Sequence, residues 1–182
     1  MKREMKRLIM CEGSNELAVV NILLENDALI FTEDDLLGLT PYHARQIKNN
    51  TQVQAALSMY FGNDVLVMRI GDKQTDRLVI PADFKEKICE TVKNCTLPEL
   101  EMLLIISEGL VKEYEKVKSS VRPKVFAKEH IRCNQKKYDN SSQFYRDYYG
   151  SDCGKLIQAI RDYKRIRGSH RRDELYLADI LK

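Results

Sequence analysis

The stretch Leu8–Glu16 reads LIMCEGSNE, an apolar run that ends in a carboxylate, turns on a glycine and continues into an amphipathic pattern. A strand followed directly by a helix is the opening half of a βαβ unit. Ser14 or Asn15 is expected to cap the helix, and Gly13 permits the tight turn. In open α/β sheets functional residues gather at the carboxyl ends of strands, where Glu12 stands. The stretch therefore predicts an α/β fold with a functional edge.

A second strand brings another carboxylate to the same expected edge. Residues 65–70 read VLVMRI, as in a central parallel strand, and Asp72 follows them. If both strands belong to one parallel sheet, Glu12 and Asp72 converge. Glu16 lies one helical turn after Glu12, so both carboxylates can face one cation. A second interpretation of Glu16 remains open, because a first-turn glutamate also offsets the helix dipole.

The rest of the chain is expected to alternate between short strands and helices. A short strand is expected at residues 28–32, and the acidic run after it is interpreted as a solvated loop in preference to a part of the site. Thr40-Pro41 favours a helical region that runs to about residue 61, with a break near Asn49-Asn50 as the alternative to one continuous helix. Further helices are expected at residues 81–94 and 100–106, from residue 141 onward and from residue 151 or 152 to 167, before an amphipathic tail at 175–181.

The helix expected at residues 100–106 is apolar around most of its surface and is therefore expected to be central and buried. Thr96 and Glu99 have the spacing of a capping box at its start. Two interpretations of Glu101 remain open. Beside a buried surface its carboxylate needs a partner, a cation or an altered pKa. Alternatively, it is exposed on a narrow polar face with Glu108.

The composition is that of a globular protein: 43% of the 182 residues are hydrophobic and 31% are charged. Proline and glycine are sparse, so we expect an α/β domain at residues 1–120 and a basic helical extension at 121–182 packed on the same unit. We expect no signal peptide and no membrane span, since the apolar runs are too short. The five cysteines form no Cys-x-x-Cys pair, which favours reduced thiols, a cytoplasmic location and no zinc.

The basic charge is concentrated in one segment. Residues 122–172 hold 14 Lys and Arg against 5 Asp and Glu, whereas residues 1–121 hold 15 against 19. This asymmetry suits a protein whose basic C-terminal segment binds a polyanion and whose acidic N-terminal part carries out the chemistry on it. The expected nucleic-acid-binding residues are Lys73, Lys136, Lys137, Lys155, Arg161, Lys164 and Arg165. A solvated basic surface without a ligand is the alternative, and the interleaved tyrosines can stack on bases or belong to the core.

Several common catalytic motifs are absent from the sequence. It contains no phosphate-binding loop and no dinucleotide fingerprint, so no nucleotide cofactor is expected. What remains is a set of carboxylates: Glu12, Glu16, Asp72, Asp76, Glu99 and Glu101. Hard oxygen ligands suit Mg²⁺ or Mn²⁺, the ions that support phosphodiester chemistry.

The segment Glu12–Glu16 resembles the Glu-Gly-x-x-Glu signature of the Toprim-like superfamily. It is most similar to the Toprim domains of overcoming-lysogenization-defect nucleases and to small stand-alone bacterial Toprim-like proteins. Asp72 resembles the first aspartate of that family's Asp-x-Asp motif, and residues 98–101 are similar to a Pro-Glu-x-Glu segment of the stand-alone members. The resemblance covers residues 8 to about 110 and implies a Toprim/Rossmann-like, mostly parallel central sheet flanked by helices.

The resemblance also implies roles for individual residues. Glu12 would be the general acid/base and a metal ligand, with Glu16 and Asp72 on Mg²⁺ or Mn²⁺ and Asp76 or Glu101 as further ligands. The chain departs from the family because no acid stands two residues after Asp72. Either Asp76 substitutes or a second metal site is lost, and Lys73 would then supply a fixed positive charge.

These observations lead to one expected function and two alternatives. We expect a metal-dependent Toprim-type nuclease or nuclease-like protein that acts on DNA or RNA, with a defence role suggested only by the family. One alternative is a catalytically degenerate Toprim fold that binds nucleic acid or a partner protein without cleavage. The other is an α/β subunit whose basic helices form a protein interface. A homodimer or a larger defence complex is compatible with each.

Overall fold

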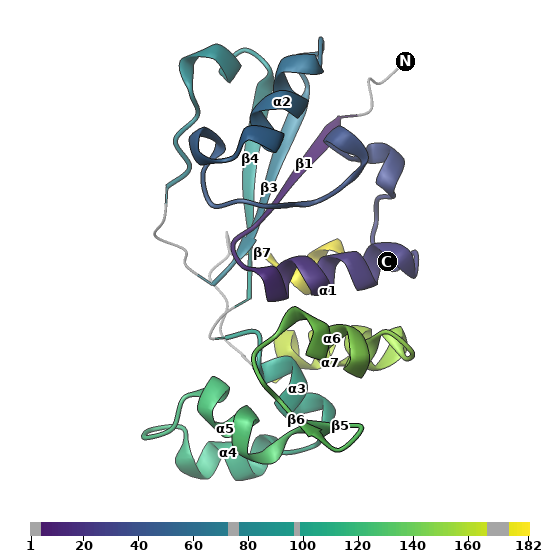
Figure 1. Cartoon of the computed structure of the whole chain (residues 1–182), viewed down its shortest axis with the longest axis vertical. Helices are drawn as coiled ribbons and strands as arrows, with labels where there is room; N and C mark the ends of the chain where they lie inside the picture. The colour runs from purple at the N-terminus through teal and green to yellow at the C-terminus, as the bar shows by residue number, and fades with distance from the viewer. Residues whose placement is uncertain (1–4, 73–76, 97–98, 167–174) are drawn as a thin grey trace.

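The computed structural model describes residues 5–72, 77–96, 99–166 and 175–182. Its centre is a five-stranded sheet in which every neighbouring pair is parallel, with the strand order β2-β1-β3-β4-β7 (Figure 1). The strands are β1 (Lys6–Cys11), β2 (Tyr42–His43), β3 (Val65–Gly71), β4 (Ile88–Cys95) and β7 (Leu175–Tyr176). The predicted α/β class with a mostly parallel central sheet is confirmed.

The sheet is buried on both faces, as its apolar strands require. Along β1, Leu8 and Met10 point to one face, while Ile9 and Cys11 point to the other. The first face packs on α2 (Thr51–Met59). The second packs on α1 (Ser14–Glu25) and on helices from the second half of the chain. This alternation follows from the two-residue period of a strand.

The second half of the chain is largely helical and lies beyond the carboxyl end of the sheet (Figure 1). It contains α3 (Met102–Ser107), α4 (Val111–Val117), α5 (Pro123–His130), α6 (Ser142–Tyr149) and α7 (Cys153–Ile166), with a small hairpin of β5 (Arg132–Cys133) and β6 (Lys136–Lys137). One continuous hydrophobic core joins β1 and α1 to these helices, and α3 is buried as predicted. Among the described helices, none combines the length and apolar character needed to cross a bilayer.

Three predicted elements are wrong. Residues 28–32 form no sheet strand, only a bridge between Leu29 and Leu181. The predicted helix start at Thr40-Pro41 is wrong, because β2 follows it, whereas a helix after a break near Asn49-Asn50 is confirmed by α2, which begins at Thr51. The helix expected at residues 81–94 is instead a short turn followed by β4. In the last two cases pairing with a distant strand outweighs the local pattern.

The C-terminal tail is part of the sheet. Leu175 and Tyr176 pair with the end of β4, and the backbone N–H of Lys182 donates to the carbonyl of Ala28 over 3.0 Å. The predicted helix starts near residues 141 and 152 are confirmed by α6 and α7. The basic C-terminal segment is therefore helical in α6 and α7 and then returns to the sheet.

Candidate functional site

A cleft of about 470 Å³ opens at the carboxyl end of the sheet. It lies where the strand order reverses: β1 leads to β2 on one side, and β3 flanks β1 on the other. Ligand sites of open α/β sheets form at such switch points. We call it the acidic cleft, because its lining includes the carboxylates Glu12, Glu16, Asp72, Glu99 and Glu101, together with Ser14, Asn15, Asn140 and the cations Arg45, Arg122 and Lys124.

Glu12 is fixed between two strands. Its backbone N–H donates to the carbonyl of Ile70 over 2.8 Å, and the residue is only 9% exposed. Its side chain lies directly over Gly71, where an added Cβ would approach its Oε2 to 2.2 Å and its Cβ to 2.7 Å. The Nε of Arg45 is 3.7 Å from Glu12 Oε1 and donates to the Glu12 carbonyl over 3.3 Å. Gly71 thus leaves the space that this carboxylate occupies.

Glu16 folds back over the start of α1. An added Cβ at Gly13 would lie 2.5 Å from Glu16 Oε2. The N-cap of α1 is Gly13, without a side-chain cap, so the predicted capping by Ser14 or Asn15 is wrong. Gly13 has an extended backbone with φ −132°, and a side chain there would meet only the flexible end of Glu16, which would have to move away.

The negative charge around Glu16 is not fully neutralised. Burial raises the pKa of this carboxyl first, and repulsion from Asp72, Glu12 and Glu101 raises it further, against a backbone hydrogen bond that lowers it. The structure therefore brings three other predicted site carboxylates, Glu12, Asp72 and Glu101, within electrostatic reach of Glu16. A cation or a proton would relieve their repulsion.

Glu101 is buried at the start of α3, with 6% exposure. The Tyr138 hydroxyl donates to Glu101 Oε1 over 2.8 Å, and burial followed by the Glu101 charge raises the pKa of Tyr138. The alternative of an exposed Glu101 beside Glu108 is wrong. Glu108 is at the surface, where it pairs with Lys155.

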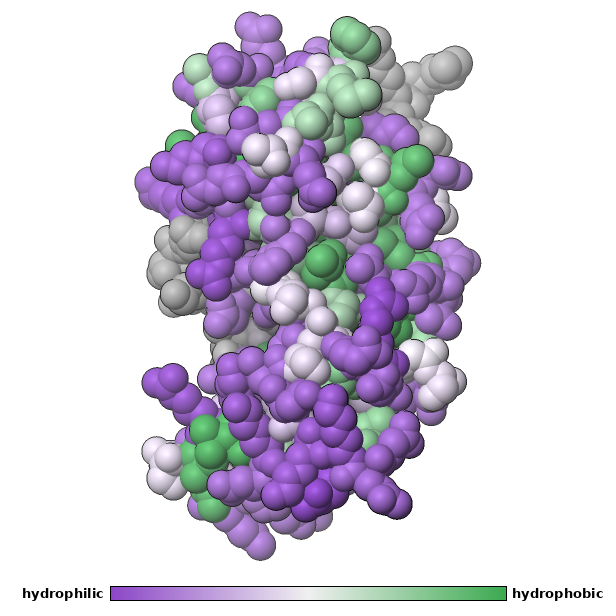
Figure 2. Space-filling view, in the orientation of Figure 1, coloured by the Kyte–Doolittle hydropathy of each residue, from purple (hydrophilic) through white to green (hydrophobic). Residues whose placement is uncertain are grey.

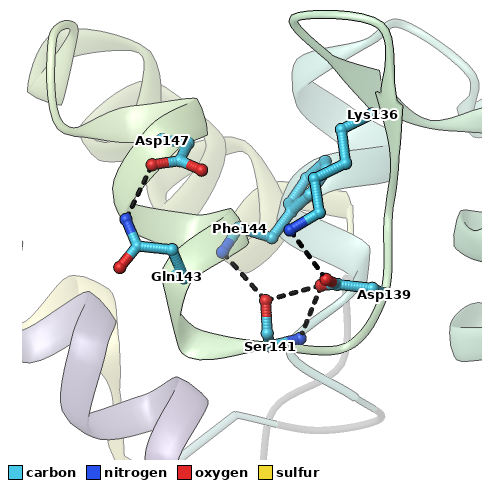
Figure 3. Close-up of polar contacts among 6 residues, drawn as sticks. All are labelled: Lys136, Asp139, Ser141, Gln143, Phe144 and Asp147. Atoms are coloured by element: carbon cyan, nitrogen blue, oxygen red, sulfur yellow. Dashed lines mark hydrogen bonds and ion pairs between the residues drawn. The ribbon is translucent and has the colours of Figure 1, made fainter.

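A short loop from the second half of the chain reaches the acidic cleft through Asn140. Asp139 accepts a hydrogen bond from the Ser141 N–H over 3.0 Å and pairs with Lys136 over 2.9 Å, and Ser141 Oγ caps α6 at Phe144 N over 3.1 Å (Figure 3). These contacts hold Asn140 at φ +65°, where its Oδ1 accepts from Asn15 Nδ2 over 3.3 Å. Sequence reasoning missed Asn140, although DNSS is a turn-forming sequence.

Glu99 also lines the acidic cleft, but its carboxylate is bound to the backbone of α5. Its Oε2 accepts from the N–H of Lys124, in the first turn of α5, over 3.0 Å. Thr96 Oγ1 is buried and has no hydrogen-bond partner in the described structure. The predicted Thr96/Glu99 capping box is therefore wrong, and α3 begins only at Met102.

The cations of the acidic cleft were also missed. Arg45 follows β2, and Arg122 and Lys124 stand at the start of α5, so only the fold brings them to the carboxylates. Behind Glu12, Arg69 and Lys93 line a small adjoining cavity. Lys93 Nζ is buried and has no hydrogen-bond partner within the described residues. Lys73 and Asp76, predicted for the same edge, lie outside the described residues.

The other predicted nucleic-acid-binding residues lie away from the acidic cleft, and most have partners. Two ion pairs join α7 to neighbouring segments, Lys155 with Glu108 and Lys164 with Asp179, and Arg165 pairs with Asp162 within α7 itself. Arg161 donates to the Lys182 carbonyl over 2.8 Å, and Lys136 pairs with Asp139. Lys137 is exposed on the hairpin. The structure does not bring these residues to the carboxylates.

The carboxylates do not form a closed ligand set. Within the described ranges, no group of three or more His, Cys, Asp and Glu side chains is arranged to hold a metal ion. Asn15 Oδ1, an oxygen of the type that Mg²⁺ accepts, is buried in the acidic cleft without a hydrogen-bond donor in the described structure. This oxygen of Asn15 and the raised pKa of Glu16 both indicate that the part of the acidic cleft lined by carboxylates would bind a cation better than an anion.

Comparison with family models, with curated proteins and with solved structures gives no match for this chain.

Proposed function

We propose that this protein is a Mg²⁺- or Mn²⁺-dependent nuclease of Toprim type that acts on nucleic-acid phosphodiesters in the acidic cleft. The observation that carries the proposal is the meeting of Glu12, Glu16, Asp72 and Glu101 in one cleft at the switch point of a parallel sheet. Phosphodiester chemistry needs both negative ligands for a cation and positive charge for the substrate.

The division of charge within the cleft supports this function. Glu16, Asp72 and Glu101, with Asn15 Oδ1, are the oxygens that would hold the ion. Bound there, Mg²⁺ or Mn²⁺ would polarise the phosphate and activate the attacking water. Arg45, Arg122 and Lys124 line the same cleft and are suited to bind substrate phosphates.

Glu12 is the proposed general acid/base, in agreement with the Toprim resemblance. Its carboxylate lies at the switch point over Gly71, with Arg45 as its neighbouring cation. A carboxylate held at this position can give or take a proton at a phosphate oxygen. A role in bacterial defence is part of the proposal through the family resemblance alone.

The test combines metal binding and cleavage. Four proteins are compared: the wild type, Glu12→Gln, Asp72→Asn and, as control, Glu90→Gln at an exposed position of β4. Thermal unfolding of each is measured with and without MnCl₂. Separate samples are incubated with single- and double-stranded DNA and RNA to measure cleavage. Mn²⁺ at about 100 times its Kd is expected to stabilise wild type and control by about 2.7 kcal/mol and Asp72→Asn by less. Cleavage is expected to need metal and to be lost in Glu12→Gln. Equal behaviour of all four proteins would overturn the proposal.

A second candidate is a protein of the same fold that binds nucleic acid or a partner protein without cleavage. It is favoured by the missing acid two residues after Asp72 and by the absence of a closed metal-ligand group in the described part of the chain. Nucleic-acid binding that weakens steeply with salt, ignores a chelator and is never followed by cleavage would select this candidate.

A further inference from the structure

The cations in the second half of the chain are of two kinds, those paired with a carboxylate and those without such a pair among the described residues. On α7, Lys155, Lys164 and Arg165 each pair with a carboxylate. On α5 and the β5–β6 hairpin, five cations have no ion-pair partner among the described residues: Arg122, Lys124, Lys128, Arg132 and Lys137. A polyanion can bind the second group without displacing internal partners, so the second group is the stronger candidate surface.

These cations follow the exposed side of α5. Phe126 and Ala127 bury the opposite side, with 3% and 0% exposure. Lys124 and Lys128 are four residues apart, which places them on one helix face about 6 Å apart along the axis. Arg122 and Lys124 line the acidic cleft, so this row begins at the site itself. Glu129 is the one acid on α5, and it is exposed.

The hairpin, which follows α5 directly in the chain, carries two further exposed cations. Cys133 and Lys136 pair across it, and Lys136 is bound to Asp139 beside α6 (Figure 3). Arg132 and Lys137 also pair, and strand alternation directs them to the other face of the hairpin. Both side chains are exposed. The lower part of the molecule, around α4, α5 and the hairpin, is mostly hydrophilic in Figure 2, apart from one hydrophobic patch at its left side.

We propose that Arg122, Lys124, Lys128, Arg132 and Lys137, together named the α5 track, bind the phosphate backbone of a single nucleic-acid strand and lead it into the acidic cleft. The proposal rests on the proposed function for the identity of the polyanion. Successive cations one helical turn apart can meet successive phosphates of an extended strand. The α5 track replaces α7 as the surface that holds the substrate.

The experiment measures binding without metal, so that it does not depend on cleavage. A labelled single strand of DNA and one of RNA, of the same mixed sequence, are titrated by fluorescence anisotropy in EDTA between about 50 and about 200 mM KCl. The track variant is Lys128→Gln/Arg132→Gln/Lys137→Gln. The matched control, Lys155→Gln/Lys164→Gln/Arg165→Gln, loses the same charge from α7. Melting curves confirm that both variants are folded.

The track variant is expected to lose at least about tenfold in affinity at low salt. The slope of the logarithm of the binding constant against the logarithm of the salt concentration is expected to become shallower by about 2, because each of the three lost phosphate contacts contributes about 0.7. The α7 control is expected to stay close to wild type. An equal or larger loss in the control, or no loss in the track variant, would overturn the α5 track. Wild-type binding without any metal-dependent cleavage would remove the proposed nuclease activity and leave the track standing.

Discussion

At the residue scale, two glycines border the carboxylates of the acidic cleft, and Gly71 is the more restrictive, because an added Cβ there would lie 2.7 Å from the Cβ of Glu12. Gly71 leaves room for Glu12, and Gly13 leaves room for Glu16. Neither position has a positive φ, so the requirement is for space and not for backbone freedom. The sequence indicated a glycine turn at residue 13, whereas the importance of Gly71 depends on the register of β1 against β3.

Thr96→Val is expected to stabilise the protein by about 1 kcal/mol. Thr96 is 4% exposed and its hydroxyl has no hydrogen-bond partner among the residues described, so removing the hydroxyl removes a desolvation cost at nearly constant volume. Urea unfolding measures the change. A capping role for Thr96 predicts a loss of similar size instead, and that result would contradict the structure.

Glu16→Gln is expected to stabilise the protein in a pH-dependent way. Because the pKa of Glu16 is raised above 4.5 in the folded state, the ionised carboxyl destabilises the fold above that raised pKa. The cost disappears as the pH falls below 4.5, the ordinary value of the unfolded chain. The gain in Tm should therefore be largest at about pH 8 and vanish near about pH 4. A gain independent of pH, or equal to that of Glu90→Gln, would contradict the charge cluster.

At the element scale, the loop before α6 connects the helical half of the chain to the sheet. Tyr138 binds Glu101, and Asn140 binds Asn15 of α1. In the same loop the backbone N–H of Ser141 donates to Asp139, as Figure 3 shows. The geometry of the site thus depends on side chains that carry no catalytic chemistry.

Tyr138→Phe is expected to cost about 1.5–3 kcal/mol, because it leaves the buried Glu101 carboxylate without its hydroxyl donor. Tyr114→Phe is the control: Tyr114 is also buried, and its ring packs edge-on against Phe126, away from the Glu101 carboxylate. Chemical denaturation of both variants gives the comparison. Equal losses in the two would show that the Tyr138–Glu101 contact contributes little.

The mispredicted elements share a physical cause. In β4, apolar residues recur at Ile88, Val92 and Cys95, a spacing that is also typical of a helix face. The segment is a strand because β3 pairs with it along most of its length. At two residues, β2 is too short to have a period, and only its pairing with β1 defines it.

At the scale of the whole molecule, one core extends from the sheet to the helices of the second half, and the tail completes it. Tyr176 in β7 is 2% exposed, and its carbonyl accepts from Asn94 Nδ2 over 3.0 Å. The chain therefore returns to its starting sheet after the helical segment.

Tyr176→Ala is expected to cost about 3–5 kcal/mol, as for other large aromatic residues in a core. Leu175→Ala, at the exposed neighbouring position of the same strand, is expected to cost much less. Thermal unfolding of both variants checks this. Similar, small losses would mean that the tail is an appendage and not a strand of the sheet.

The sequence alone determined the α/β class, the strand–turn–helix at residues 8–16, the strand before Asp72 and the burial of α3. Each of these depends on local periodicity or on the rule that parallel strands end at one edge. The tertiary structure decided the roles of Arg45, Asn140 and Tyr138 and the distinction between paired and unpaired cations. Those features depend on contacts such as Tyr138–Glu101, between residues 37 positions apart, and no local pattern encodes a pairing over that distance.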